Sequence, residues 1–290
     1  MEPGANSKMP NAKLPQLLLL IILIWIIFIN CDHSNSQEQP IQKTPAQIEK
    51  TIAGLDEPDS HIPILCYHQV RDWKSNDSKN ARTYILPVDA FKEQMKWLHD
   101  RGYHTILPDQ LIAYIEKGTA LPPHPVMLTF DDAIQSQYIN ALPELNKAGF
   151  KAVFFIMTVV LNHNEYMSKD EVEELAKQGH VIGCHTWDHR PVTLYNESDW
   201  MTELEKPTAE LEKITGKPIK YFAYPYGTWD DAAISRLEKN GYTAAFQLWG
   251  KGDQPSPLYT IKRQLVSGYW DTKEFINTIH RLEKTTMPKI

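Results

Sequence analysis

The amino-acid sequence predicts an α/β protein whose main domain is a distorted (β/α) barrel of about seven parallel strands. Three observations favour this fold: short runs that are apolar at nearly every position, helical patterns between them, and a glycine where each helical pattern stops. Strands that are apolar on both faces are typical of parallel sheets covered by helices. The periodicity alone leaves an open, doubly wound sheet as the alternative.

Glycines mark the helix ends that the patterns predict. Helical patterns stop at Gly102, Gly149, Gly179 and Gly241, and more loosely at Gly216. Glycine just past a helix readily adopts the left-handed conformation that other residues resist. Including two runs outside this repeat, the strands are expected at 62–67, 126–130, 151–157, 180–184, 221–224 and 243–246.

The N-terminal segment differs from the rest of the chain. Lys8 and Lys13 precede an unbroken apolar run at 17–29, which is typical of an export signal and short for a membrane span. Cys31 follows and resembles the lipidated cysteine of a bacterial lipoprotein, although Asn30 departs from that pattern. We expect residues 1–31 to be a lipoprotein-type signal or an uncleaved anchor, with simple secretion as a third alternative.

A polar, proline-dotted stretch at 32–60 reads as a tether, so that 61–290 forms the folded domain outside the cytoplasm, attached to the membrane at the cell envelope. The net charge of −6 disfavours a nucleic-acid partner. Cys66 and Cys184 lie in apolar runs and are expected to be buried and free. The domain is expected to be monomeric.

Polar side chains that bind metals follow several of the predicted strands. His68 follows the first strand, Asp131 and Asp132 follow the second, and His185 and His189 follow "HVIGC". The carboxyl ends of parallel barrel strands meet at one rim, where active sites lie. We therefore expect these side chains to converge.

The residue types at this rim indicate a metal site. A helical turn would present both imidazoles of "HTWDH" on one face. Two imidazoles and one carboxylate are a typical three-ligand set for Zn²⁺, with Co²⁺ or Ni²⁺ as alternatives. One aspartate would complete the set and the other would act as general base on a metal-bound water. The alternative is that the aspartates cap a helix beginning near Ala133.

Three motifs carry a family resemblance: "TFDD" ending at Asp132, "HTWDH", and "YPYG" ending at Gly227. They resemble the motifs of the polysaccharide deacetylases, carbohydrate esterase family 4, whose domain is also called the NodB homology domain. "PILCYHQV" resembles the branch that de-N-acetylates poly-β-1,6-N-acetylglucosamine. The resemblance runs from about residue 61 to the C-terminus and implies metal-dependent hydrolysis of N-acetyl groups on a sugar polymer.

Residue by residue, the resemblance implies specific roles. Asp131 matches the general base, and Asp132, His185 and His189 match the metal ligands. Tyr226, preceded by Pro225, matches the residue whose backbone N–H holds the oxyanion.

Two positions depart from the family pattern. Ala223 stands where many members have an arginine that orients the base; Arg263 is the candidate substitute, or else a surface arginine. For the acid that protonates the leaving amine, the suspected branch points to His68, with a buried core histidine as the alternative; a late candidate, His280, lies in a helical pattern.

Two tryptophans are candidates for stacking on sugar rings. Trp187 lies between the expected ligand histidines and Trp229 follows "YPYG"; core packing is the alternative for both. Together these features predict a de-N-acetylase of a β-linked N-acetylglucosamine polysaccharide of the biofilm type. Peptidoglycan or chitin-like oligomers are alternative substrates, and a non-catalytic membrane-anchored glycan-binding protein is the alternative of another class.

Overall fold

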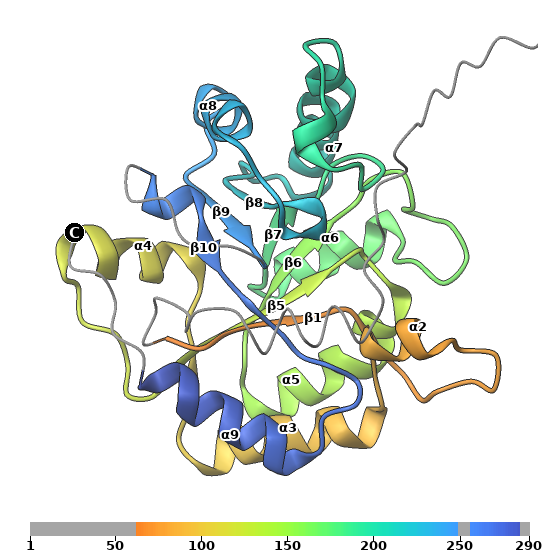
Figure 1. The fold of residues 1–290 in the computed structure, drawn as a ribbon, viewed down its shortest axis with the longest axis vertical. Coiled ribbons are helices and arrows are strands. Elements are labelled where there is room, and N and C mark those ends of the chain that lie inside the picture. Colours follow the sequence, from red (N-terminus) through yellow and green to blue (C-terminus); the bar gives the residue numbers. More distant parts are fainter. Residues whose placement is uncertain (1–61, 249–255, 285–290) are drawn as a thin grey trace, which may run out of the picture. The chain divides into compact units, whose positions relative to one another are not determined.

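Figure 1 labels the barrel strands. They are short runs in which almost every residue is buried, as the apolar runs of the sequence predict. The structure is a computed structural model and describes residues 62–248 and 256–284. The main strands are β1 (Ile64–Tyr67), β5 (Pro125–Asp131), β6 (Val153–Ile156), β7 (Val181–Cys184), β8 (Tyr221–Ala223) and β9 (Ala244–Gln247). Two-residue strands are β2 (Gln69–Val70), β3 (Ile85–Leu86), β4 (His104–Thr105), β10 (Ile261–Lys262) and β11 (Gln264–Leu265).

The main sheet is parallel throughout and runs in the order β10-β9-β8-β7-β6-β5-β1-β11, with β4 paired to β5. Only Arg263 separates β10 from β11. One short segment, 261–265, therefore pairs with β9 at one end of the order and with β1 at the other. It closes the sheet into a distorted barrel, which confirms the predicted fold class and excludes the open doubly wound sheet.

Helices surround this barrel, and the glycines predicted to end them take left-handed conformations. Gly102, Gly149, Gly179, Gly216 and Gly241 have φ between 65° and 87°. The helices are α2 (Lys79–Thr83), α3 (Val88–Asp100), α4 (Pro108–Lys117), α5 (Leu142–Ala148), α6 (Lys169–Lys177), α7 (Lys206–Thr215), α8 (Asp231–Lys239) and α9 (Thr272–Glu283). Shorter turns are η2 (Gln137–Ala141), η3 (Val192–Leu194), η4 (Met201–Glu205), η5 (Pro225–Gly227) and η6 (Pro257–Tyr259).

Alternation along the strands divides the core into two apolar layers. On β5, Leu128 and Phe130 belong to the layer that packs beneath the helices, whereas Met127 belongs to a second cluster with Phe155 and Phe246 from neighbouring strands. Thr129 and Asp131 share the face of Met127. The strand that ends at Asp131 therefore sends this carboxylate to the face of the second cluster, which it shares with the buried guanidinium of Arg263.

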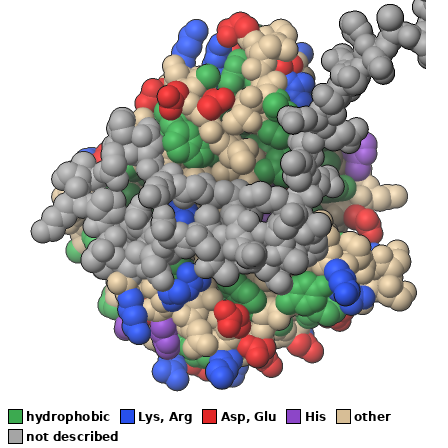
Figure 2. All heavy atoms as spheres, viewed as in Figure 1, with side chains coloured by type: hydrophobic (Ala, Val, Ile, Leu, Met, Phe, Trp, Pro, Cys, Tyr) green, Lys and Arg blue, Asp and Glu red, His purple; other side chains and the backbone are tan. Residues whose placement is uncertain are grey.

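The N-terminal assignments, namely the signal or anchor at 1–31 with Cys31 and the tether at 32–60, lie outside the described residues. Within 62–248 and 256–284, no helix has the length and apolar character needed to cross a bilayer. Cys66 and Cys184 are buried and free, as expected. Acidic and basic side chains are interspersed on the coloured parts of the face shown in Figure 2.

Candidate active site

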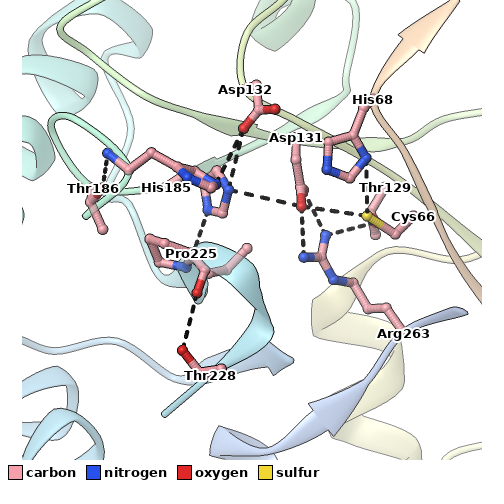
Figure 3. A network of polar contacts seen from close by, with 12 residues as sticks. Cys66, His68, Thr129, Asp131, Asp132, His185, Thr186, Pro225, Thr228 and Arg263 are labelled. Atoms are coloured by element: carbon pink, nitrogen blue, oxygen red, sulfur yellow. Dashed lines mark hydrogen bonds and ion pairs between the residues drawn. The ribbon is translucent and has the colours of Figure 1, made fainter. Parts of the chain in front are cut away.

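The carboxyl ends of adjacent strands bring the candidate residues together, as Figure 3 shows. His68 follows β1, Asp131 ends β5, and His185 follows β7. These strands lie within one run of the sheet order, so side chains more than a hundred residues apart in sequence become neighbours. The convergence predicted from the strand ends is therefore what the fold produces.

Asp132, His185 and His189 point their ligand atoms at one small volume. The Oδ1 atom of Asp132 lies 3.5 Å from Nε2 of His185 and 3.6 Å from Nε2 of His189. Asp132 Oδ1 and His185 Nε2 are buried, and neither has a hydrogen-bond partner. Unpartnered buried polar atoms are costly, so the arrangement fits a divalent cation bound between them.

Protonation states in this group also suit metal binding. Burial lowers the pKa of His185 to about 3 and lowers that of His189, so both imidazoles are neutral at physiological pH. Burial raises the pKa of Asp132 to about 6, because its charged form loses hydration. A metal requires neutral imidazoles and an ionised carboxylate as its ligands. A nearby cation would favour the ionised form of Asp132, because it would offset the loss of hydration.

A hydrogen bond to the backbone fixes the orientation of the His185 imidazole. Nδ1 of His185 donates a hydrogen bond to the carbonyl oxygen of Ala223 on β8, over 2.7 Å. This assigns the proton to Nδ1 and leaves the lone pair of Nε2 directed at Asp132. Ala223, the position that departs from the family pattern, thus contributes through its backbone.

The segment between the two histidines is not a helical turn, and the expectation of one was wrong. Residues 185–189 form an irregular loop in which Thr186 and His189 have φ of 69° and 70°. The hydroxyl of Thr186 accepts a hydrogen bond from the backbone N–H of His189 over 2.9 Å. The loop, rather than helical periodicity, brings the two rings to a centroid distance of 4.7 Å.

Asp131 lies beside the ligand group but has a different partner. Arg263 donates through Nη1 to Oδ1 at 2.6 Å and through Nη2 to Oδ2 at 2.7 Å, and both side chains are buried. Burial alone would raise the pKa of Asp131, but the charge of Arg263 and the electrostatic contribution of His185 bring it below its usual range. Arg263 is therefore not a surface arginine.

The helix-capping alternative for the two aspartates does not match the structure. Asp132 and Ala133 have φ of 79° and 57°, and the helical segment that follows begins only at residue 135. The left-handed turn reorients the chain after β5, so the second carboxylate also stays on the rim.

The two candidate acids occupy very different places. His68 follows β1, with Nδ1 3.9 Å from Sγ of Cys66, and its ring contacts that of Tyr84. His280 is exposed on α9, where its ring contacts Trp97. Because α9 packs against α3, His280 belongs to the outer helical layer, whereas His68 lies next to Asp131.

Tyr226 stands at the rim in a left-handed conformation, with φ of 59°. Its ring lies 4.6 Å from that of His189. The N–H groups of Gly227 and Thr228 bond to the carbonyls of Tyr224 and Pro225, whereas that of Tyr226 has no acceptor within the described residues. A backbone donor without an acceptor in the protein is what an oxyanion site requires.

The two tryptophan candidates differ in their exposure to solvent. Trp187 is 39% exposed beside the ligand histidines. Trp229 is half-buried against the core and its indole N–H donates to Gln247 over 2.9 Å, so packing accounts for much of its surface. Pro225 is buried at the start of η5.

Sequence reasoning missed three residues of the site. The thiol of Cys66 donates to Oδ2 of Asp131 over 3.4 Å, and Thr129 accepts from Arg263 over 3.1 Å. Gln137, fully buried, donates from Nε2 to the carbonyl oxygens of His68 and Asp131 and so ties the two strand ends together. Alternation along β5 puts Thr129 on the same face as Asp131 and could have indicated it, whereas nothing in the local sequence singles out Gln137.

A parallel barrel with two carboxylates, two imidazoles and a buried arginine at its carboxyl rim defines a hydrolase of the α/β-barrel class. A family model described as polysaccharide deacetylase matches residues 118–245. The chain is 30% identical over 253 residues to the poly-beta-1,6-N-acetyl-D-glucosamine N-deacetylase of Staphylococcus epidermidis, covering 79% of this chain and 86% of that one.

A second relative and a solved structure agree with that match. The poly-beta-1,6-N-acetyl-D-glucosamine N-deacetylase of Staphylococcus aureus is 32% identical over 230 residues, covering 70% of this chain and 78% of that one. The deacetylase PplD of Streptococcus pyogenes, solved with acetate, has the same fold with a TM-score of 0.69 at 22% identity, over 75% of this chain and 97% of that one. The chain belongs to the polysaccharide deacetylase family and is a polysaccharide N-deacetylase.

Proposed function

We propose that this enzyme removes N-acetyl groups from a β-1,6-linked N-acetylglucosamine polymer in a metal-dependent reaction at the cell envelope. The observation that carries the proposal is the candidate metal-ligand group of Asp132, His185 and His189, which lies beside a carboxylate, that of Asp131, held by Arg263. Two relatives that share about a third of their residues with this chain are named for that polymer.

The ligand group fits a divalent ion, with Zn²⁺ preferred and Co²⁺ or Ni²⁺ as alternatives. Its three ligand atoms lie within 4.8 Å of one another. Asp132, His185 and His189 would hold this ion, which would supply a lower pKa for the attacking water and polarisation of the acetamide carbonyl. The remaining chemistry belongs to the side chains and backbone of the chain.

Asp131 acts as the general base and takes the proton of the water that attacks the acetamide carbon. Arg263 keeps this carboxylate ionised and fixes both of its oxygens. The backbone N–H of Tyr226 donates to the acetamide oxygen as that oxygen gains negative charge. His68 gives a proton to the nitrogen as the carbon–nitrogen bond breaks, so that acetate and a free amine leave.

The location at the envelope follows from the N-terminal sequence. A basic segment, the apolar run at 17–29 and Cys31 favour export with attachment through an anchor or a lipid, and the stretch at 32–60 would then hold the domain at 61–290 away from the membrane. The exposed part of Trp187 beside the ligand group would stack on the sugar ring being processed, with a smaller contribution from Trp229.

Acetate release from defined β-1,6- and β-1,4-linked N-acetylglucosamine oligomers tests this function. The full chain, assayed after removal of metal and again after addition of Zn²⁺, should release acetate only with metal and faster from the β-1,6 series. Preference for the β-1,4 series would move the substrate to peptidoglycan or chitin-like polymers, and release that resists a chelator would contradict metal dependence.

A pair of matched variants tests the assignment of the two aspartates. Asp131→Asn should lower kcat by at least about 100-fold, because the general base is lost, while the metal content stays near that of the wild type. Asp132→Asn should lower both the metal content and kcat. If Asp131→Asn keeps most of its activity, or loses its metal, the assignment of Asp131 as base is wrong.

A further inference from the structure

Two exposed aromatic side chains lie together away from the ligand group. Trp73, in the segment after β2, is 36% exposed, and Tyr269, in the segment after β11, is 43% exposed. Their ring centroids lie 5.2 Å apart at an angle of 60°. We call this pair the Trp73–Tyr269 platform. Sequence patterns did not single it out, because its members are almost two hundred residues apart.

The polar ends of both rings are tied to backbone carbonyls of one segment. The indole N–H of Trp73 donates to Ile85 over 2.8 Å, and the hydroxyl of Tyr269 donates to Lys79 over 3.0 Å. The guanidinium of Arg82 lies 4.9 Å from the centre of the Trp73 ring. The rings are thus held in place before any ligand arrives, which reduces the entropy cost of binding to them.

The loop that carries Tyr269 is clamped to the same segment. The backbone N–H of Gly268 donates to Thr83 over 3.0 Å. A Cβ atom at Gly268 would lie only 2.1 Å from the carbonyl oxygen of Ile85 and 2.2 Å from that of Arg82. This close contact between backbones leaves the loop little conformational freedom. The exposed surface of the platform is therefore held in a fixed position on the rim.

The platform lies on the same rim as the ligand group. β1 and β11 are parallel neighbours, and the loops that carry Trp73 and Tyr269 extend from the carboxyl-end side of these strands. Tyr84, which directly precedes the Ile85 carbonyl that holds Trp73, contacts the ring of His68 at a centroid distance of 5.0 Å. The platform is therefore adjacent to the His68 side of the site.

Exposed aromatic side chains concentrate on this rim. In the part of the chain that the structure describes, the exposed large aromatic side chains are those of Trp73, Trp187, Tyr226 and Tyr269. Each follows the carboxyl end of a barrel strand or the short strand β2 next to it. Exposed apolar surface gathered beside a site marks a place where a ligand binds.

From this arrangement we infer that the Trp73–Tyr269 platform is a stacking subsite for a second sugar ring of the same polymer, beyond the unit that loses its acetyl group. The apolar face of a pyranose ring packs on an aromatic ring without needing a charge, which suits a neutral N-acetylated sugar. The inference rests on the proposed function, because it places one more unit of that substrate along the same rim.

Kinetics on oligomers of different length test the subsite. The measured quantity is the ratio of kcat/KM for a long β-1,6 oligomer to that for the disaccharide. In the wild type this ratio should be well above one, and Trp73→Ala and Tyr269→Ala should each lower it about fivefold through a higher KM for the long oligomer. Tyr269→Phe removes only the hydroxyl that fixes the ring and should lower the ratio less.

Met201→Ala is the matched control, since Met201 is 50% exposed on η4, outside the platform, and should leave the ratio unchanged. If acetate is released but the platform variants keep the wild-type ratio, the subsite is refuted while the proposed function stands. If no oligomer yields acetate even with metal, the proposed function fails. Binding of the long oligomer to wild type and Trp73→Ala, measured by titration calorimetry, then decides the subsite alone: equal affinities overturn it and a loss supports it.

Discussion

Asp131 and Asp132 are adjacent in the chain, yet their surroundings give them opposite pKa shifts. Burial raises the pKa of Asp132 to about 6, whereas the pKa of Asp131 falls below its usual range because the charge and the hydrogen bonds of Arg263 outweigh the effect of burial. Neighbouring groups with divergent environments are the usual sign of divided roles in a catalytic site. Here the carboxylate without a counter-ion is the one that faces the two imidazoles.

His180, a buried histidine outside the candidate metal group, should lower the free energy of unfolding at low pH. The ring of His180 is almost fully buried, and its Nδ1 accepts a hydrogen bond from the backbone N–H of Ala152 over 3.1 Å. Burial, with a smaller effect of the charge of Lys151, lowers the pKa of His180 to about 4. In the unfolded chain the pKa is about 6.5, so between these values protons bind preferentially to the unfolded chain and stability falls as the pH falls.

His180→Asn should remove this contribution. Asparagine keeps an acceptor for Ala152 but does not titrate, so between pH 7 and pH 4 the wild type should lose about 2–4 kcal/mol more of its free energy of unfolding than the variant does. Urea unfolding at a series of pH values measures the difference. His280→Asn, at an exposed position, should follow the wild type. Parallel curves for His180→Asn and wild type would contradict the assignment.

At the scale of elements, the strand ends were predictable and the loops were not. Runs of residues that are apolar on both faces predicted the positions of β1, β5, β6, β7, β8 and β9. A strand buried on both faces needs apolar residues at nearly every position, so it can be recognised in the sequence. The conformation of residues 185–189 was predicted wrongly, since two left-handed residues depend on contacts that no periodicity reports. The pairing of Arg263 with Asp131, 132 residues apart, depends on how the barrel closes.

The close contact between the loop after β11 and the α2–β3 segment predicts that Gly268 cannot be replaced by a larger residue without loss of stability. Gly268→Ala should lower the free energy of unfolding by about 1–3 kcal/mol or more, because a Cβ atom would overlap backbone carbonyl oxygens. Gly216 is the control: it has φ of 65° but open space around it, so Gly216→Ala should cost only about 1 kcal/mol. Chemical denaturation measures both, and equal small losses would show that the loop moves away at little cost.

At the scale of the whole molecule, the site spans the barrel rather than any one segment. The family model matches 118–245, which contains Asp131, Asp132 and both ligand histidines. His68, which follows β1, lies before that region, and Arg263, which directly precedes β11, lies after it. β1 pairs with both β11 and β5. Sequence motifs therefore revealed the ligand group more readily than the residues that surround it.

Because the ligand atoms come from the turn after β5 and from the loop after β7, a bound ion should stabilise the entire fold. At a Zn²⁺ concentration about 100 times the Kd, the free energy of unfolding should rise by about 2.7 kcal/mol, provided the unfolded chain does not bind the ion. Urea titrations with Zn²⁺ and with a chelator measure this gain. His189→Ala, which alters a half-buried ligand, should lose most of it; an equal gain in the variant would indicate that the ion binds elsewhere.

The segment that closes the barrel also supplies the partner of the proposed general base. Arg263 occupies the single position between β10 and β11, so the same five-residue stretch that seals the ring also delivers the positive charge to Asp131. A nascent or nicked chain in which the segment 261–265 is detached would retain Asp132, His185 and His189, the candidate metal ligands, but would leave Asp131, the proposed base, without the positive charge of Arg263. Cleavage before residue 261, if it releases this segment, should therefore lower the activity although all three sequence motifs stay intact.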